Sequence, residues 1–186
     1  MAENKVQFGL KNCYYAVVTD NGGTYTYGTP VAIKGGVNLN LDAAGDVTRF
    51  YADNITYYMS QANQGYEGSL ELARVPDEMY KDVFGLTEGA TSKVLTEDIS
   101  VEPKHIALLF QIDGDADEEL HCLYDVVPTR PTIASGTIQA TKEPVTATIN
   151  ITALPRPEDG KVRARTTADT PTATRNTWFT QVFVEA

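Results

Sequence analysis

Alternation of apolar and polar residues with a period of two is the feature that most constrains the fold of this chain. The clearest run extends from Val145 to Thr152, where Val, Ala, Ile and Ile alternate with Thr, Thr, Asn and Thr. Similar alternation occurs in four other segments, at 14–18, 37–42, 106–112 and 120–126. Trp178 to Val184 is rich in aromatic and β-branched residues and predicts a final strand. Seven or more short strands predict a mainly β protein, a β-sandwich or barrel of antiparallel strands.

One segment, Asn63 to Gly85 (NQGYEGSLELARVPDEMYKDVFG), predicts a strand followed by the single helix of the chain. We expect this helix at about residues 76–84. Pro76 suits a first helical position, where its missing N–H costs nothing. Gly85 suits the residue in left-handed conformation that ends a helix. Two pairs spaced four residues apart form its buried stripe: Met79 with Val83, and Tyr80 with Phe84. The helix is therefore expected to pack against a β structure and close it.

Length and charge limit the classes of function. A chain of 186 residues, 42% of them hydrophobic, fits one packed domain over 1–186. Its 15 basic and 25 acidic residues give a net charge of −10, which argues against tight binding of phosphates and predicts repulsion of DNA. The start MAENKVQFG lacks the apolar core of a signal peptide, and no apolar run is long enough to span a membrane. We therefore expect a soluble protein made inside the cell, with no membrane span.

Residue types that carry catalysis are sparse. Cys13 and Cys122 lie in apolar strands, where buried free thiols are expected, with a disulfide as the alternative. His105 and His121 also lie in apolar strands, and each is interpreted as a packed or half-exposed strand residue rather than a base or ligand. No nucleophile, zinc or phosphate-binding motif is present. We predict that the chain is not an enzyme and uses no cofactor.

The acidic segment Asp113–Glu119 begins like a calcium-binding loop. It has Glu118 where the sharp turn of such a loop requires glycine, and Tyr124 where the bidentate glutamate is needed. We interpret it as a solvated hairpin tip, with weak calcium binding as the alternative, and predict no metal site.

The polar faces of three predicted strands, at 37–42, 67–72 and 145–153, contain no lysine or arginine. Such a face offers DNA phosphates no ion pairs and no counterion release, so a nucleic acid would slide along it without adhering. The alternative is chance depletion of cations over a short stretch. The candidate lumen-facing residues are Asn38, Asn40, Glu67, Ser69, Glu71, Thr146, Thr148 and Asn150.

Two segments depart from regular alternation. Residues 42–53 (DAAGDVTRFYAD) place a small, polar tip between two strand-like runs and predict a long hairpin loop. Residues 154–176 contain three prolines and most resemble a loop, either a floppy surface segment or an arm that orders against a neighbouring subunit. Its candidate inter-subunit cations are Lys161, Arg163, Arg165 and Arg175. A short N-terminal arm is expected at about residues 1–10.

The segment 63–85, together with FYADNITYYMS at 50–60, resembles the major tail proteins (tail tube proteins) of long, flexible-tailed phages of Gram-positive bacteria. The layout of the chain, with a short N-terminal arm, alternating strands and a long irregular segment before the end, is similar to theirs. The resemblance implies a tail-tube-like fold and a six-subunit ring that stacks into a tube around the genome. It also implies an inter-ring role for the hairpin loop residues, which are Asp42, Ala43, Ala44, Gly45, Asp46 and Arg49.

The partners implied by the resemblance are further copies of the chain, a tape-measure protein, and the tail terminator and distal tail proteins. DNA would pass without specific binding, and the protein would be located in the virion tail after assembly in the host cytoplasm. A β-sandwich module that binds carbohydrate or a cell surface is the alternative, because ten tyrosines and one tryptophan offer stacking platforms. A calcium-dependent hydrolase is a third and weaker hypothesis.

Overall fold

The computed structural model describes residues 9–114, 118–137 and 144–185, and it is mainly β, with antiparallel strands and two short helices. This confirms the predicted mainly β class, although a second helix is present where the sequence predicted only one. Residues 1–8 of the predicted N-terminal arm lie outside the described residues. The strands of the main sheet are β1 (Leu10–Asp20), β2 (Tyr25–Tyr27), β3 (Val31–Ile33), β4 (Gly36–Ala44), β7 (Gly65–Leu72), β10 (Ile106–Ile112), β11 (Leu120–Pro128), β12 (Ala147–Leu154) and β13 (Arg163–Arg165).

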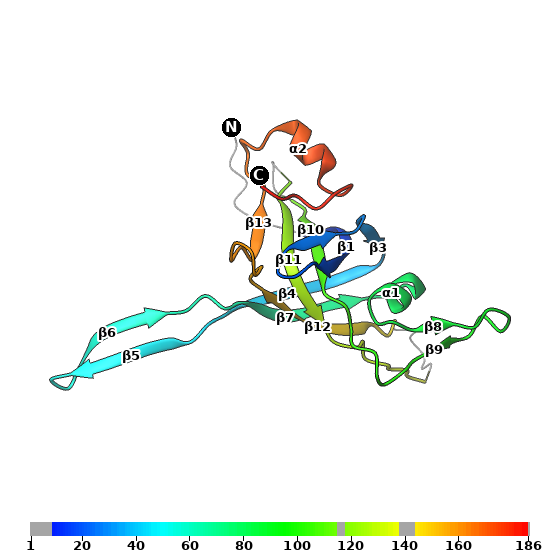
Figure 1. Ribbon diagram of the computed structural model, residues 1–186, viewed down its shortest axis with the longest axis horizontal. Helices are drawn as coiled ribbons and strands as arrows, with labels where there is room; N and C mark the ends of the chain where they lie inside the picture. The colour runs from blue at the N-terminus through cyan, green and yellow to red at the C-terminus, as the bar shows by residue number, and fades with distance from the viewer. Residues whose placement is uncertain (1–8, 115–117, 138–143, 186) are drawn as a thin grey trace.

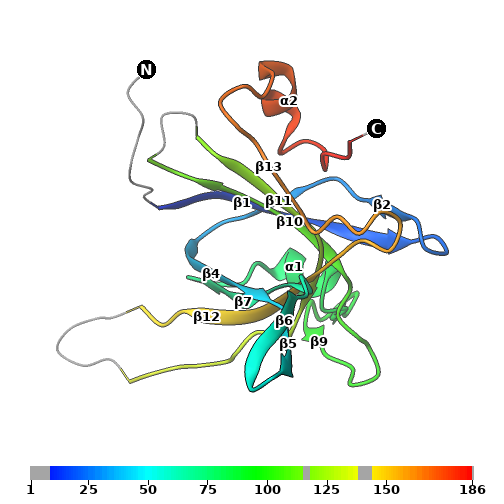
Figure 2. The ribbon, with the colours of Figure 1, turned by 90° about the vertical axis from the view of Figure 1, so that its left-hand side faces the viewer.

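Within the described part of the chain these nine strands form one sheet. Seven of them follow the order β2-β1-β10-β11-β12-β7-β4, while β3 pairs with β1 and β13 pairs with β11. The sheet divides at β11, which pairs with β13 along its first half and with β12 along its second half. The sheet curls, so that β1, β10 and β11 form one layer and β4, β7 and β12 form another (Figure 2). Gly36 at the start of β4 lies close to Leu10 and Cys13 of β1, so the two ends of the sheet flank one core.

The larger core lies between the two layers and is closed by α1 (Asp77–Asp82). Met79, Val83 and Phe84 are buried against the sheet, which confirms the predicted apolar stripe. The helix is shorter than predicted at both ends: Pro76 is the extended N-cap residue (φ −63°, ψ 143°), and Val83 is the C-cap. Gly85 has the predicted left-handed conformation, with φ +69°.

A second core lies on the other face of β10 and β11, and the C-terminal segment covers it. The prediction of a final strand at 178–184 is wrong, because α2 (Thr172–Thr177) ends at Trp178 and the following residues are irregular. Trp178 is buried in this second core and donates a hydrogen bond from Nε1 to the carbonyl of His121 (3.3 Å). The aromatic residues here supply a cover for the sheet rather than a further strand.

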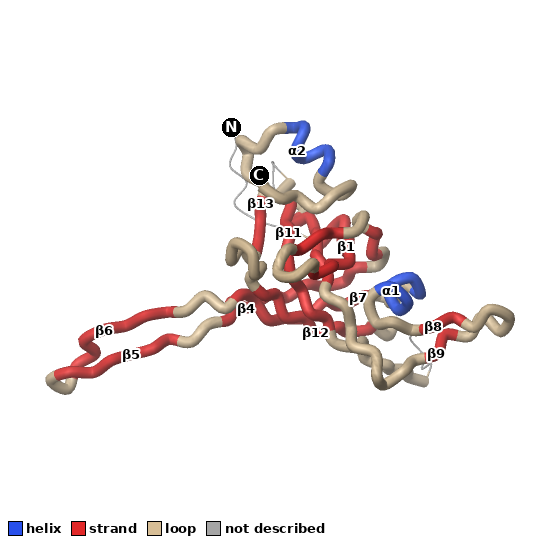
Figure 3. Tube along the Cα trace, viewed as in Figure 1, coloured by secondary structure: helices blue, strands red, loops and turns tan. Residues whose placement is uncertain are grey.

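Two hairpins project from opposite ends of the main sheet (Figures 1 and 3). The longer one consists of β5 (Val47–Ala52) and β6 (Ile55–Gln61), and the shorter one of β8 (Thr87–Glu88) and β9 (Leu95–Thr96). No helix in the described ranges is long and apolar enough to cross a membrane.

Candidate functional site

The outer face of the β12-β7-β4 layer brings most of the predicted lumen-facing residues together. Pairing is in register across all three strands, so cross-strand neighbours form rows. The rows, each written from β4 through β7 to β12, are Asn38–Glu71–Thr148, Asn40–Ser69–Asn150 and Asp42–Glu67–Thr152. The alternate residues Leu70 and Ile149 are buried in the core. The nine polar residues of these rows therefore share the face that points away from the core.

Within this polar face the described strands β4, β7 and β12 contain no lysine or arginine. Its charged groups are three carboxylates, from Asp42, Glu67 and Glu71. Asn40 donates a hydrogen bond from Nδ2 to Asp42 (3.2 Å), and Thr146 donates one from its hydroxyl to Glu71. Thr146 precedes β12, which begins at Ala147 rather than at the predicted 145. The face is thus an acidic, hydrogen-bonded surface.

The hairpin that follows β4 is longer than predicted, and its tip lies elsewhere. Asp42, Ala43 and Ala44 belong to β4 and are paired with β7, while Gly45 and Asp46 lie at the base of the projection. The tip is the two-residue turn Asp53-Asn54, in which both residues have positive φ (52° and 62°). Positive φ at both central positions is what a type I′ hairpin turn requires. The predicted hairpin loop, 42–53, is therefore corrected: its tip lies at 53–54.

We call the projecting hairpin, Val47–Gln61, the arm. Residues directly opposite each other on an antiparallel pair share a face. Phe50 lies opposite Tyr58 on one face, while Arg49 lies opposite Met59 on the other. Large apolar side chains are exposed on both faces: Val47, Phe50, Tyr51, Ile55, Tyr57, Tyr58 and Met59. An isolated two-stranded hairpin is at best marginally stable in water, so this arm lacks the packing that a partner surface would supply.

The full extent of the arm was not predicted from the sequence. The dipeptide Asp53-Asn54, placed between two runs rich in β-branched and aromatic residues, was the available signal for a two-residue hairpin loop. Gly45 is required at the base, because a side chain there would collide with the carbonyl of Ala62.

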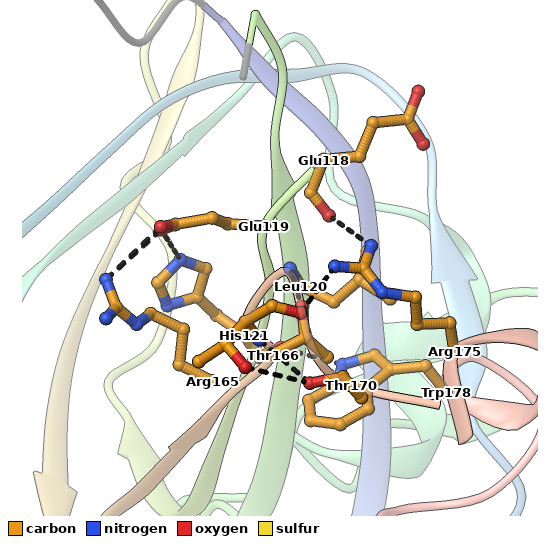
Figure 4. A network of polar contacts seen from close by, with 10 residues as sticks. Glu118, Glu119, Leu120, His121, Arg165, Thr166, Thr170, Arg175 and Trp178 are labelled. Carbon is orange, nitrogen blue, oxygen red and sulfur yellow. Dashed lines mark hydrogen bonds and ion pairs between the residues drawn. The ribbon is translucent and has the colours of Figure 1, made fainter. Parts of the chain in front are cut away.

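The predicted C-terminal arm, residues 154–176, is more ordered than expected, since it contains β13 and most of α2. Its cations contact their own chain, as Figure 4 shows for two of them. Arg165 forms an ion pair with Glu119 (3.2 Å), and Arg175 donates to the carbonyls of Thr167 (2.8 Å) and Glu118 (3.4 Å).

The other two cations of this segment also have partners within the chain. Lys161 lies 3.5 Å from Asp159 and 3.6 Å from Glu185, and the guanidinium of Arg163 lies over the ring of Tyr66, 5.3 Å from its centre. The segment thus packs onto the sheet of its own subunit. A role of these cations in contacts between subunits stays a prediction.

His121 occupies a buried position next to this network (Figure 4). Its ring stacks on Phe110 (4.9 Å between centres), and Nε2 lies 3.4 Å from a carboxylate oxygen of Glu119. Burial lowers the pKa of His121, and the positive charge of Arg163 acts in the same direction, while Glu119 opposes it. His121 is therefore a packed, neutral strand residue at pH 7. Its packing agrees with the prediction from the sequence.

His105 belongs to a polar cluster that the sequence did not reveal. Its Nδ1 lies 2.6 Å from the buried carboxylate of Asp125, which also accepts a hydrogen bond from the hydroxyl of Tyr25 (3.0 Å). Burial, followed by the charge of Asp125, raises the pKa of Tyr25 to about 12. The three residues come from separate strands or their ends, and satisfying the Asp125 carboxylate is a sufficient structural role for them.

Cys13 and Cys122 are both buried free thiols, so the predicted state is confirmed and the disulfide alternative is wrong. Burial raises the pKa of Cys13 to about 11 and that of Cys122 to about 12. Among the described residues no group of His, Cys, Asp and Glu is arranged to hold a metal ion. The predicted acidic hairpin tip, 113–119, lies partly outside the described residues.

No family model and no curated protein matches this chain.

Proposed function

We propose that this chain is a self-assembling structural protein, the subunit of a phage tail tube whose stacked, six-subunit rings conduct the genome. The observation that carries the proposal is the arm, which exposes apolar side chains on both faces and has no packing partner among the described residues. Apolar surface of this kind on an ordered hairpin marks a contact with another protein. A second copy of the same chain is always present at matching concentration.

In this proposal the polar face lines the lumen of the tube. It lies on the outer side of a three-stranded layer whose other side is buried, and it presents carboxylates and amides without any cation in the described strands. A channel lined in this way repels phosphates and releases no counterions, so DNA moves through it without binding. Among the described strands β4 is the last of this layer, and its outer edge suits pairing with a neighbouring subunit, which would extend the layer around a ring.

The resemblance to phage tail tube proteins implies that the partners of the assembled tube are tape-measure, terminator and distal tail proteins. The protein would be found in the virion tail after assembly in the host cytoplasm, and it would act without catalysis or a cofactor.

A carbohydrate-binding module is the alternative, and the exposed aromatic residues of the arm are what favour it. Tyr57 is 72% exposed, although Trp178, the only tryptophan, is buried and unable to stack on a sugar. The two functions differ in what the arm contacts. The tail tube subunit assembles with itself, whereas the module stays small and binds glycans.

The deciding experiment compares the intact chain with a variant that lacks the arm. Asp46 and Ala62 are joined by a backbone hydrogen bond (3.1 Å), so an Asn-Gly turn between them closes the shortened hairpin. Light scattering and negative-stain microscopy should show rings or tubes for the intact chain at high concentration and folded monomers for the variant. An intact chain that stays monomeric at every concentration and binds glycans would overturn the proposal.

A further inference from the structure

The two ends of the curled sheet meet where the start of β1 runs beside the start of β4. A side chain added at Gly36 of β4 would lie 3.3 Å from atoms of Leu10 and Cys13 in β1. No ladder joins β1 to β4 in the described part of the chain, since β4 pairs with β7, and β3 reaches β1 only from Cys13 onward. We call this junction, formed by residues 10–12 of β1 and 36–39 of β4, the seam.

An apolar cavity of about 280 Å³ lies at the seam. Three of the side chains that line it, Leu10, Leu39 and Ile112, pack against the larger core but stay partly exposed. Val37 also lines the cavity; it lies where a bulge interrupts the pairing of β4 with β7, and it is 50% exposed. Water in such a cavity finds few hydrogen-bond partners, so its replacement by a hydrocarbon chain is favourable.

A second cavity, of about 410 Å³, shares Leu10 with the first and adds positive charge to the seam. Lys11 of β1 and Lys34, which lies in the turn before β4, both line it. Lys34 forms no ion pair within the described residues, and the ammonium of Lys11 lies 3.9 Å from Asp113, with both side chains about half exposed. In a chain of net charge −10, two lysines with so little compensation favour an anionic group at this place.

We propose that the seam binds a single-chain anionic amphiphile of the fatty-acid class, with its carboxylate at Lys11 and Lys34 and its hydrocarbon chain in the apolar cavity. Leu10 lines both cavities, so the ligand lies along this side chain. A free phosphate would use only the lysines, and an uncharged alcohol only the apolar lining. The site needs only the folded monomer and therefore goes beyond the proposed function.

A chain-length series tests the apolar part of the site. Calorimetry measures the binding of hexanoate, octanoate and decanoate to the monomeric chain, at ligand concentrations at which no micelles form. The affinity should rise by about fourfold for each added methylene that enters the cavity, which is the gain expected for burial of one methylene. An affinity that does not depend on chain length would overturn the proposal.

The variant Lys11→Gln with Lys34→Gln tests the cationic part. It should bind decanoate several-fold more weakly than the unmodified chain, because exposed ion pairs contribute little individually but both lysines act on one carboxylate. Its affinity for decanol, which has the same chain length and no charge, should not change. Equal loss of decanoate and decanol binding would mean that the substitutions disturb the cavity, and no loss of either would remove the lysines from the site.

Val37→Glu places a carboxylate in the apolar cavity at a position outside both core clusters of the described residues, so the subunit should still fold, as urea unfolding can check. Decanoate binding should weaken at least tenfold, because the new charge has to be desolvated and repels the ligand. Val184→Glu is the matched control: its site is exposed and lines neither cavity, so binding should be unchanged.

Two further outcomes count against the site. Decanoate that binds Val37→Glu as tightly as the unmodified chain would place the ligand elsewhere. If the unmodified chain binds no decanoate and Val37→Glu instead prevents self-association, the seam is a contact with a second copy and the proposal is wrong. The titrations use the monomer, so their result and that of the assembly experiment are independent.

Discussion

Phe50 of β5 and Tyr58 of β6 face each other across the arm, and their side chains are 59% and 60% exposed. Aromatic residues at directly opposite positions of a hairpin stabilise it locally, but this exposure leaves most of their apolar surface in water. Substitution of this pair therefore tests assembly separately from folding.

We predict that Phe50→Thr combined with Tyr58→Thr abolishes assembly and leaves the subunit folded. Threonine keeps the β propensity of both positions, and the free energy of unfolding should change by only about 0.5 kcal/mol, because neither side chain belongs to a core cluster of the described residues. Urea unfolding and light scattering measure the two effects. Val184→Thr, an exposed apolar position outside the arm, is the control, and assembly by the double variant would remove the aromatic pair from the contact.

A second prediction concerns the polar face. Glu67→Lys with Glu71→Lys places cations in two of the three cross-strand rows of a surface that lacks them. If this face lines the lumen, tails assemble normally but DNA leaves slowly, and higher salt partly restores the rate, because many weak phosphate contacts sum along one polymer.

The matched control for this experiment is Glu67→Gln with Glu71→Gln, which removes the carboxylates without adding cations and keeps an acceptor for Thr146. Ejection of labelled DNA from virions is the measurement. Normal ejection by tails built from the lysine variant would place these residues away from the DNA path.

Phe84→Asp should destabilise the subunit by about 4 kcal/mol, because it removes a buried ring and puts an unpaired carboxylate into the larger core. Phe84→Leu keeps an apolar side chain and should cost only about 1–2 kcal/mol. Thermal unfolding of both variants tests the role of α1 as the closure of the sheet. Equal midpoints for the two variants would mean that the helix lies outside the cooperative core.

The pH dependence of stability should include a contribution from His121. Its pKa is lowered in the folded protein, chiefly by burial, so below the unfolded value of about 6.5 the unfolded chain takes up a proton that the folded chain does not. Stability is therefore lost as the pH falls from about 6.5 toward the folded pKa. Glu119 opposes this loss, while Arg163 and Arg165 add to it.

His121→Phe preserves stacking on Phe110 and should reduce the loss of unfolding free energy between pH 7 and pH 5 relative to the unmodified chain. The comparison isolates His121 from the carboxylates that titrate in both proteins. Identical pH profiles for the two proteins would exclude a contribution from this residue.

The sequence by itself determined the mainly β class, the strands with strict alternation, and the apolar stripe of α1. These features depend on local spacing, because a period of two or of four residues decides which side chains share a face. The same spacing identified the residues of the polar face. That Asn38, Glu71 and Thr148 form one row required the strand order β12-β7-β4 and its register, which pair residues 33 and 77 positions apart.

Only the tertiary structure decided the roles of the arm and of the C-terminal segment. Aromatic residues at 50–58 and at 178–183 look alike in sequence, yet the first group stands exposed on a hairpin and the second covers β10 and β11. The type of a side chain determines how favourable the free energy of its burial is. Whether a surface of the same chain is available to bury it depends on where the sheet leaves an uncovered face, and here the chain covers the second group and leaves the arm in solvent.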